Sequence, residues 1–233
     1  MGKTFARALR VMKNPRLIIN FIRHRLFHLV GDRTLNDGER FDPTIFKSFG
    51  LSEAASLARY RFARRIIVSS GDILDIACGT GYGTLMLADI CQTITGVDIS
   101  PEAISFARKR YQKKNNIRFL VGDLMANQIS ADCLVSFETV EHLEDDLRLV
   151  LAKLVSHCRQ KMILSVPYQE MPGHNRHHRK FQLNEQDFSD LAASGSVRFF
   201  YQAPSGQITN ERKDRPETLI IVWERTSAIS ALI

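Results

Sequence analysis

The sequence predicts an α/β protein with a doubly wound, mainly parallel sheet. Short apolar runs alternate with amphipathic helical patterns through most of the chain, and a glycine-rich loop separates the first apolar run from the helix after it. Near the C-terminus, the last two apolar runs follow one another with no helix between them. Strands connected in that way pair antiparallel, so we expect the sheet to end antiparallel.

The elements can be assigned in order along the chain. Helices are predicted at 52–68, 83–91, 101–114, 145–158 and 184–193. Strands are predicted at 73–77, 93–97, 117–121, 133–137, 162–166, 197–201 and 218–223. Because helices and strands alternate, the connections predict βαβ units with helices on both faces of the sheet.

Composition is that of an ordinary globular protein. Of 233 residues, 44% are hydrophobic and 24% are charged, which excludes a disordered, collagen-like or coiled-coil protein. The four cysteines, Cys78, Cys91, Cys133 and Cys158, form no CxxC pair and no zinc-ligand spacing with histidine. We therefore expect buried thiols in a cytoplasmic protein.

The net charge of +7 is concentrated at the N-terminus. Residues 1–31 contain seven lysines and arginines and no acid, which leaves 25 basic against 25 acidic residues in 32–233. The body of the chain is therefore not expected to bind nucleic acid. An anionic surface could be bound by 1–31 or by the local cluster 176–180.

The segment 16–30 has the pattern of an amphipathic helix with a basic polar face. Its longest apolar run, 17–19, is far shorter than the ~20 residues that span a bilayer. Two interpretations remain open: a helix lying on an anionic membrane, or a helix packed on the rest of the protein. We thus expect a basic helix and linker in 1–50 and the α/β domain in 51–233.

The clearest functional motif follows the first strand. In DIACGTGYG, residues 75–83, a glycine loop opens a helix, and the backbone of such a loop can approach a ligand closely. Asp98 ends the second strand and Asp123 follows the third, so both lie at the carboxyl ends of strands, where doubly wound sheets bind ligands. Asp98 can accept hydrogen bonds from both hydroxyls of a ribose, and Asp123 from the amine of adenine.

These motifs, in this order, resemble the class I S-adenosylmethionine-dependent methyltransferases over residues 59–225. DILDIACGTGYG is similar to the first motif of that family, VDIS to its ribose-binding acid, GDL to its adenine-side acid and SFETVEHL to its fourth motif. The resemblance implies a Rossmann-like sheet of seven strands with the last strand antiparallel, and S-adenosyl-L-methionine as cofactor. The cofactor-binding residues it implies are Asp75, Cys78, Gly79, Gly81, Asp98, Ile99, Asp123, Leu124 and Glu138. An NAD-binding domain is the alternative, although the GxGxG spacing differs from GxGxxG.

A second group of residues predicts how a methyl acceptor is activated. Glu138, Glu141 and His142 follow the fourth strand, and His177 and His178 lie in the downstream segment GHNRHHRKF. A neutral hydroxyl attacks poorly, so either a histidine acts as general base or a divalent ion lowers the pKa of the hydroxyl. The candidate catalytic residues are therefore His142, Glu141, His177 and His178.

The ExxEH grouping with later histidines is similar to the metal site of the small-RNA 3′-terminal 2′-O-methyltransferases. That resemblance implies Mg²⁺ or Mn²⁺ held by Glu138, Glu141, His142 and His178. Family members that hold no metal use the EH pair to line the pocket. For His177 and His178, the alternative is a solvated basic loop.

The flanking sequence indicates the acceptor. GERFDP, ACGTGYG, ETVEHLED and KFQLNEQDF resemble methyltransferases of bacterial polysaccharide biosynthesis, although Lys180 stands where their His-x-Arg-Glu-Phe form has an acid. This resemblance implies a glycan or lipid-linked saccharide acceptor. An acceptor carried on a lipid at the inner membrane face, met through peripheral association of 1–31, would reconcile the neutral domain with the basic N-terminus. A quinone precursor and an RNA 2′-hydroxyl are alternative acceptors. A non-catalytic cofactor-binding scaffold is the alternative from another functional class, and the oligomeric state is left open.

Overall fold

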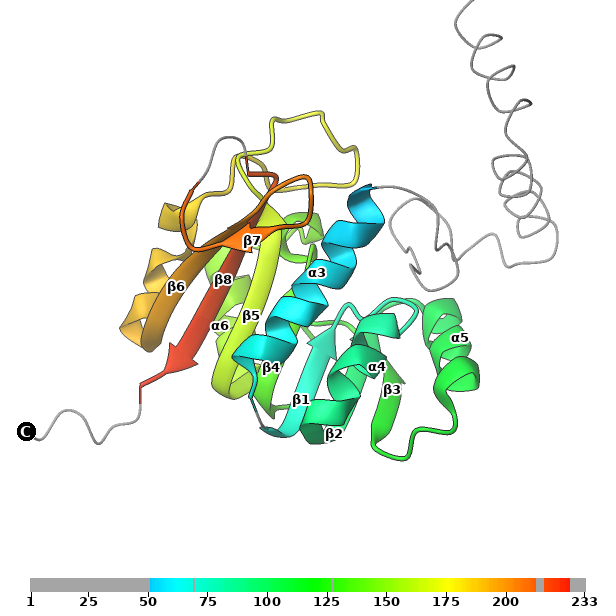
Figure 1. Cartoon of the computed structure of the whole chain (residues 1–233). Helices are drawn as coiled ribbons and strands as arrows, with labels where there is room; N and C mark the ends of the chain where they lie inside the picture. The colour runs from blue at the N-terminus through cyan, green and yellow to red at the C-terminus, as the bar shows by residue number, and fades with distance from the viewer. Residues whose placement is uncertain (1–50, 69, 127, 213–215, 227–233) are drawn as a thin grey trace, which may run out of the picture.

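The computed structural model describes residues 51–68, 70–126, 128–212 and 216–226. In these residues one sheet has the strand order β3-β2-β1-β4-β5-β8-β6-β7 (Figure 1). The strands are β1 (Ser70–Ile76), β2 (Cys91–Asp98), β3 (Ile117–Val121), β4 (Ala131–Phe137), β5 (Cys158–Pro167), β6 (Gly195–Gln202), β7 (Ile208–Thr209) and β8 (Thr218–Arg225). The predicted doubly wound α/β fold is confirmed. The two-residue strand β7, paired with β6 at the sheet edge, was not predicted.

The directions of the strands determine where a ligand-binding crevice can form. β1 pairs in parallel with both β2 and β4, and the parallel order continues to β3 on one side and β5 on the other. β8 lies antiparallel between β5 and β6, which confirms the predicted antiparallel end. The chain runs outward from β1 to β3 and then returns to β4. The strand order therefore reverses beside β1, and such a switch point leaves a crevice at the carboxyl ends of the strands.

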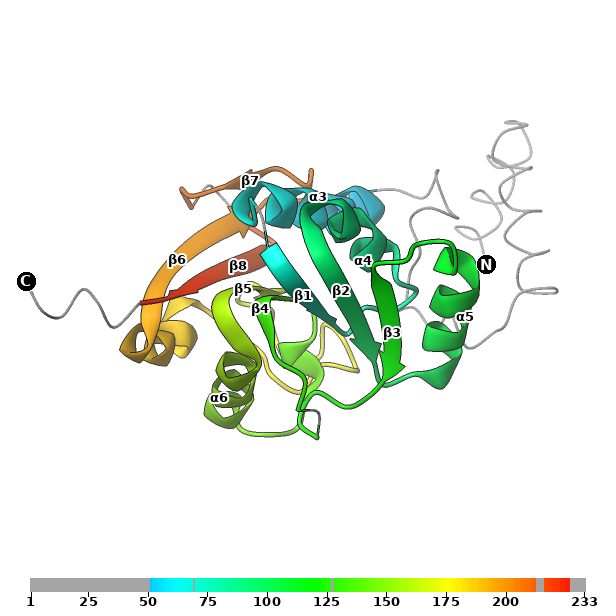
Figure 2. The same cartoon turned by 90° about the horizontal axis from the view of Figure 1, so that it is seen from below.

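Helices cover both faces of the sheet (Figure 2). The α-helices are α3 (Leu51–Ile66), α4 (Tyr82–Leu87), α5 (Pro101–Tyr111) and α6 (Leu147–His157), and the 3₁₀ helices are η2 (Ala88–Ile90), η3 (Val140–His142) and η4 (Glu185–Ala193). α3 and α4 lie on one face, α6 lies on the other, and α5 packs on β2 and β3. The predicted helix 83–91 ends as the 3₁₀ turn η2, and the predicted helix 184–193 is the 3₁₀ helix η4.

Consecutive strand residues face opposite cores. Ile73 packs in the cluster under α3 and α4, and its neighbour Leu74 packs in the cluster under α6 and η4. Both residues are about 1% exposed, as expected for a strand that is covered on both faces. Trp223 of β8 is fully buried and its indole N–H donates to the carbonyl of Leu191 in η4 (3.1 Å). This bond attaches η4 to the antiparallel end of the sheet.

Several predictions concern the N-terminal segment, membrane-spanning helices and the cysteines. The helix expected at 16–30 and the linker before residue 51 lie outside the described residues. Among the helices of the described ranges, none combines the length and apolarity needed to cross a membrane. Cys78, Cys133 and Cys158 are buried as predicted, whereas Cys91 is half-buried.

Candidate active site

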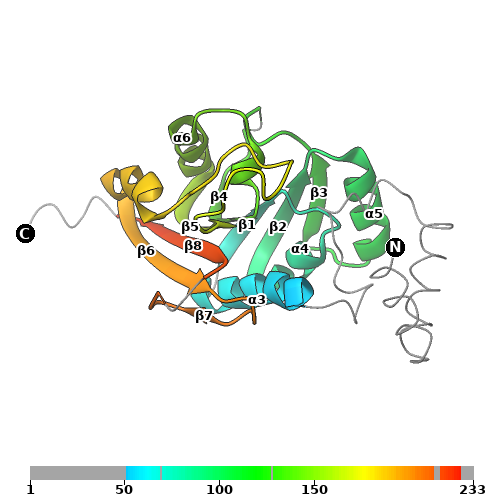
Figure 3. The same ribbon diagram turned by 90° about the horizontal axis from the view of Figure 1, so that it is seen from above.

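A cavity of about 380 Å³ lies at the carboxyl ends of β1, β2 and β4. It is lined by Ser56, Arg59, Tyr60, Ile76, Ala77, Cys78, Gly79, Thr80, Tyr82, Val97, Asp98, Ile99, Gly122, Asp123, Leu124, Phe137, Glu138, Thr139, His142 and Leu143. Figure 3 looks onto this end of the sheet and shows α3 on one side of it and the yellow segment that follows β5 on the other. We call this space the cofactor cavity. Its location is the one where doubly wound sheets bind ligands.

The glycine loop forms the floor of the cofactor cavity through its backbone. Ala77, Gly79 and Gly81 have φ values of 58°, 54° and 80°. Such left-handed residues turn the chain sharply from β1 into α4. A Cβ at Gly81 would approach the ring of Phe119 to 2.7 Å, so glycine is required there for packing as well as for conformation. Gly81 itself does not line the cavity, whereas Cys78 and Gly79 do.

Asp75 lies beneath the loop and does not line the cavity. Its carboxylate is fully buried and accepts hydrogen bonds from the hydroxyls of Thr84 (2.6 Å) and Tyr60 (3.1 Å). Burial raises the pKa of Asp75 to about 7, although the two hydrogen bonds act in the opposite direction. The predicted cofactor contact is therefore not direct in this structure. Asp75 instead joins β1 to α4 and α3.

Asp98 lies at the end of β2 and lines the cavity, and both of its carboxylate oxygens accept backbone hydrogen bonds. Gly79 N donates to Oδ2 (2.8 Å), and Ser100 N donates to Oδ1 (2.9 Å). Its neighbour Ile99 lines the same wall and is 63% exposed, which leaves an apolar surface open to a planar group. These residues form a wall suited to a nucleoside: a fixed carboxylate for hydroxyls and an apolar surface for a base.

The loop after β3 closes the same end of the cavity. Asp123 is exposed, and its Oδ1 accepts a hydrogen bond from Met125 N (2.7 Å). Leu124 is buried and also lines the cavity. The backbone hydrogen bond fixes the Asp123 carboxylate at the rim, close to the wall formed by Asp98 and Ile99.

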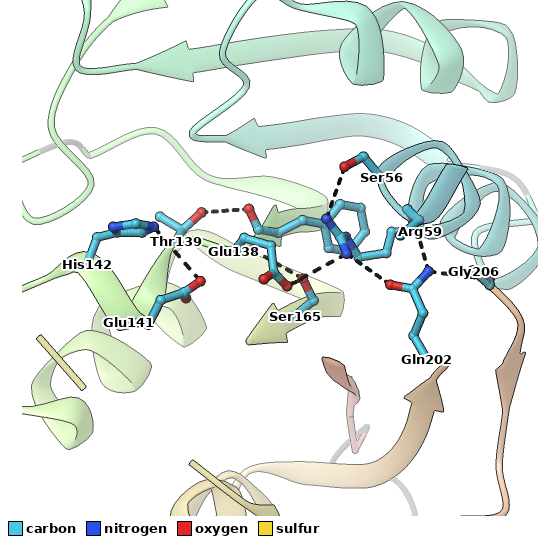
Figure 4. Close-up of polar contacts among 11 residues, drawn as sticks. Ser56, Arg59, Glu138, Thr139, Glu141, His142, Ser165, Gln202 and Gly206 are labelled. Atoms are coloured by element: carbon cyan, nitrogen blue, oxygen red, sulfur yellow. Dashed lines mark hydrogen bonds and ion pairs between the residues drawn. The ribbon is translucent and has the colours of Figure 1, made fainter. Parts of the chain in front are cut away.

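Glu138 lies across the cavity, at the end of β4 (Figure 4). Its backbone is left-handed, with a φ of 50°. Its N–H donates to the carbonyl oxygen (3.0 Å) and to Oγ (3.1 Å) of Ser165, and Ser165 Oγ in turn donates to Glu138 Oε1 (2.7 Å). These bonds to β5 fix a backbone conformation that is strained for a residue with a side chain.

Arg59 of α3 also lines this end of the cavity, and the motifs did not predict it. Its side chain is about 90% buried, with Nη1 donating to Gln202 Oε1 (2.9 Å) and Nη2 to Ser56 Oγ (3.3 Å) (Figure 4). Nη1 also lies 3.9 Å from Glu138 Oε1. One signal for Arg59 was available: it shares the apolar stripe of its helix with Phe62 and Ala63.

Three of the predicted acid–base residues come together beside Glu138. Ligand atoms of Glu141, His142 and His178 lie within 4.8 Å of one another. The rings of His142 and His178 meet edge to face, with centroids 4.7 Å apart. Of the three, His142 lines the cofactor cavity, and its Nε2 is 3.9 Å from Glu141 Oε1. His142 is therefore the member of the group that an acceptor in the cavity can reach.

Glu141 is an unusual carboxyl group. It is fully buried, and neither of its oxygens accepts a hydrogen bond from any of the described residues. Burial raises the pKa of Glu141 well above its usual range, and the nearby charge of Glu138 raises it further. A buried carboxyl without donors is stable only when it is protonated or paired with a cation.

His178, His177 and Glu138 differ in how they relate to this group. His178 contacts Glu170 through Nδ1 and Asn175 through Nε2 (2.9 Å) and does not line the cavity. His177 is exposed and receives a hydrogen bond from Arg176 Nε (2.9 Å), as a solvated basic loop predicts. Glu138 was predicted to join the metal site, but its carboxylate is engaged by Ser165 and lies near Arg59.

The parallel sheet with a late antiparallel strand, the glycine loop and the acids after β2 and β3 are the features that the chain shares with the class I S-adenosylmethionine-dependent methyltransferases. Residues 73–161 match the family described as "Methyltransferase domain". The matched residues run from within β1 to within β5 and include the glycine loop, Asp98 and Asp123.

Similar proteins agree on this class. Over 121 residues the chain is 28% identical to a probable S-adenosylmethionine-dependent methyltransferase of Mycolicibacterium smegmatis, covering 52% of this chain and 44% of that protein. It is 34% identical over 140 residues to malonyl-[acyl-carrier protein] O-methyltransferase of Acetivibrio thermocellus, covering 58% of this chain and 46% of that protein. The chain thus spans less than half the length of these two relatives.

A solved structure supports the fold. The N-methyltransferase NodS from Bradyrhizobium japonicum, in complex with S-adenosyl-L-homocysteine, aligns with a TM-score of 0.59 and 16% identity. The alignment covers 88% of this chain and 98% of that one. At this identity the likeness concerns the fold.

Proposed function

We propose that the chain is an S-adenosylmethionine-dependent O-methyltransferase whose acceptor is a sugar hydroxyl of a glycan or lipid-linked saccharide. The observation that carries the transferase assignment is a single cavity with Asp98 on one wall and His142 on another. The sugar assignment rests on the flanking motifs, because the relatives and the structural neighbour have different acceptors by name.

The cavity suggests how the cofactor binds. A carboxylate oxygen can accept more than one hydrogen bond, so Asp98 can accept from the ribose hydroxyls while it keeps its two backbone donors. Ile99 would cover a face of the adenine, and Asp123 would accept from its amine. The buried guanidinium of Arg59 suits the carboxylate of the methionyl group, because arginine and carboxylate form strong charge-assisted hydrogen bonds.

Transfer requires an in-line displacement at the methyl carbon. The bond between the acceptor oxygen and the methyl carbon forms as the carbon–sulfur bond breaks, and S-adenosylhomocysteine leaves as a neutral thioether. The hydroxyl proton passes to His142, the imidazole on the cavity wall.

A divalent ion is the second way to activate the hydroxyl, and the residues fit one. Glu141, His142 and His178 would hold the ion, whose chemistry there would be to lower the pKa of a hydroxyl. The buried carboxylate without a hydrogen-bond donor favours such an ion. The contacts of His178 with Glu170 and Asn175 favour the metal-free base instead.

Chelation distinguishes the two forms of activation. The general-base mechanism predicts full activity in EDTA, and a Glu141→Gln variant that keeps most of its activity. The metal mechanism predicts that EDTA abolishes turnover, that Mn²⁺ or Mg²⁺ restores it, and that Glu141→Gln is inactive at every metal concentration. Cofactor affinity, measured in the same samples, should not change in either case.

The membrane proposal rests on sequence alone. Seven basic residues and no acid in 1–31 would hold the domain at an anionic membrane, where lipid-linked saccharides are found. The segment lies outside the described residues, so this proposal draws on charge and spacing.

The acceptor assignment is tested by methyl transfer from labelled S-adenosylmethionine. The purified protein is offered lipid-linked saccharides, RNA and a polyprenyl quinone precursor in parallel. The proposal expects label in the saccharide fraction, and mass spectrometry should find one added methyl on a hexose-type ring. Label in the RNA or quinone fraction overturns the sugar assignment. Cofactor binding with no product from any of the three would favour the scaffold alternative.

A further inference from the structure

A loop between β5 and η4 reaches back to the cofactor cavity. Gln169 N donates to the carbonyl of Leu183 (2.9 Å), and Gln182 N donates to the carbonyl of Glu170 (2.8 Å). These two bonds close the base of a loop of residues 170–182, which we call the 170–182 loop. It is the yellow segment at the top of Figure 1. The chain therefore leaves the sheet and returns to it at the same place, and residues 170–182 pass over the end of β4.

The loop docks on the residues that flank His142. Arg179 N (2.7 Å) and Lys180 N (3.0 Å) both donate to the carbonyl oxygen of Glu141. The ammonium group of Lys180 donates to the carbonyl oxygen of Leu143. One residue, Lys180, therefore binds the carbonyl groups on both sides of His142, one through its backbone and one through its side chain.

The segment that Lys180 holds has little structure of its own. η3 is a single 3₁₀ turn of three residues, and Leu143, which follows it, has an extended backbone. Its internal bonds are His142 N to the carbonyl of Thr139 (3.1 Å) and a long bond from Leu143 N to the carbonyl of Val140 (3.4 Å). Such a short turn does not fix the direction of a side chain by itself. The contacts from the 170–182 loop therefore help to fix the direction of the His142 side chain.

The surroundings of Lys180 support a specific role for its charge. The side chain of Lys180 is half-buried, and the acids near its ammonium group are Asp145, Asp146 and Glu141. The ammonium group is therefore placed in a partly buried position among acids that follow or precede His142. The neighbouring Arg179 has an exposed side chain that pairs with Glu144 (3.5 Å).

We propose that Lys180 is a positioning residue for His142, holding the carbonyl groups of Glu141 and Leu143 so that the imidazole faces the acceptor in the cofactor cavity. The proposal rests on the proposed function of His142 as the group that activates the acceptor. It adds to that function a residue that touches neither cofactor nor acceptor. Reaction rates are sensitive to such placement, because a displacement of about 1 Å can lower a rate on the order of 100-fold.

The test compares Lys180→Met, which keeps the aliphatic stem and removes the ammonium group, with the control Arg179→Met one residue earlier. Lys180→Met is expected to lower kcat about 10-fold or more, with the Kd for S-adenosylmethionine and the thermal midpoint near those of the wild type. Arg179→Met should match the wild type in all three. Lys180→Arg, which keeps a cationic donor, should recover a large part of the lost kcat. If Lys180→Met does not fold, Lys180→Gln takes its place.

A second measurement does not depend on turnover. The imidazole signal of His142 in the cofactor-bound protein, assigned by its absence in His142→Ala, is followed by NMR. Lys180→Met should shift this signal, and Arg179→Met should not. If the wild type shows no methyl transfer, this shift still supports the positioning role while the proposed function fails. An unchanged signal, or a loss of kcat that only parallels losses of stability and cofactor affinity, overturns the proposal.

Discussion

Replacing Asp98 with alanine is the most direct test of how the cavity binds its cofactor. The carboxylate of Asp98 is 5% exposed and receives hydrogen bonds from Gly79 N and Ser100 N. Its position is therefore set before any ligand arrives. Alanine removes the acceptor for the ribose hydroxyls and also leaves two backbone N–H groups without their partner.

The size of the effect follows from these bonds. A hydrogen bond to a charged group contributes about 1.5 to 3 kcal/mol when it is lost with its partner left behind. Water can enter the open cavity and satisfy part of the loss, so we expect a net weakening of about 1 to 3 kcal/mol, or roughly 5- to 150-fold in Kd. Asp98→Asn should bind S-adenosylmethionine nearly as weakly as Asp98→Ala, because the amide N–H₂ group would face a backbone N–H donor.

The assay is isothermal titration calorimetry with S-adenosylmethionine and with S-adenosylhomocysteine. Asp190→Ala is the matched control, since its carboxylate is exposed on η4 and pairs with Arg148 (3.1 Å) away from the cavity. Circular dichroism should show both variants folded. An unchanged Kd in folded Asp98→Ala, or tight binding of NAD by the wild type, would refute the cofactor assignment.

Three further predictions concern the base, a buried acid and the N-terminus. His142→Ala should lose about 100-fold or more in kcat while the Kd for S-adenosylmethionine stays near wild type; full activity would exclude His142 as base and as ligand. The pKa of Asp75 is raised by burial from 3.8 to about 7, so the stability that its protonated form contributes at low pH is lost as pH rises toward and through 7. The unfolding free energy of the wild type minus that of Asp75→Asn should therefore fall as the pH rises over that window. A difference that does not depend on pH would contradict the raised pKa of Asp75. Deleting 1–31 should preserve cofactor binding and abolish sedimentation with phosphatidylglycerol vesicles at low salt. If the full chain does not bind such vesicles, the membrane proposal fails.

The parts of the fold that the sequence predicted are those set by short-range patterns. Alternating apolar runs placed every long strand, because a strand covered on both faces must be apolar along its length. The antiparallel end was predictable because only a turn-rich segment separates the last two runs. β7 was not, since two residues at a sheet edge leave no periodic signal. The 3₁₀ form of η4 was not predicted either, because its apolar residues have the same spacing as those of an α-helix.

The cofactor side of the site could be predicted because it depends on strand ends. Asp98 and Asp123 follow parallel strands, and any residue in that position reaches the same edge of the sheet. Arg59 and Gln202 were missed because their contact joins residues 143 positions apart in the sequence. Arg59 comes from a helix that precedes the sheet, and only its place on an apolar stripe marks it.

The acid–base side shows why spacing alone misleads. Glu138 and Glu141 are three residues apart, and in a helix that spacing would put both carboxylates on one face. The helical turn begins only at Val140, however, and Glu138 stands before it with a left-handed φ of 50°. Its carboxylate therefore turns to Ser165, while Glu141 is buried beside His142. Any cation bound here would thus meet one carboxylate and two imidazoles, a ligand set that favours Mn²⁺ over Mg²⁺, because imidazole is a poor ligand for magnesium. If EDTA does abolish activity, Mn²⁺ should restore it at lower concentration than Mg²⁺, and the reverse order would mean that Glu138 rotates to join the site.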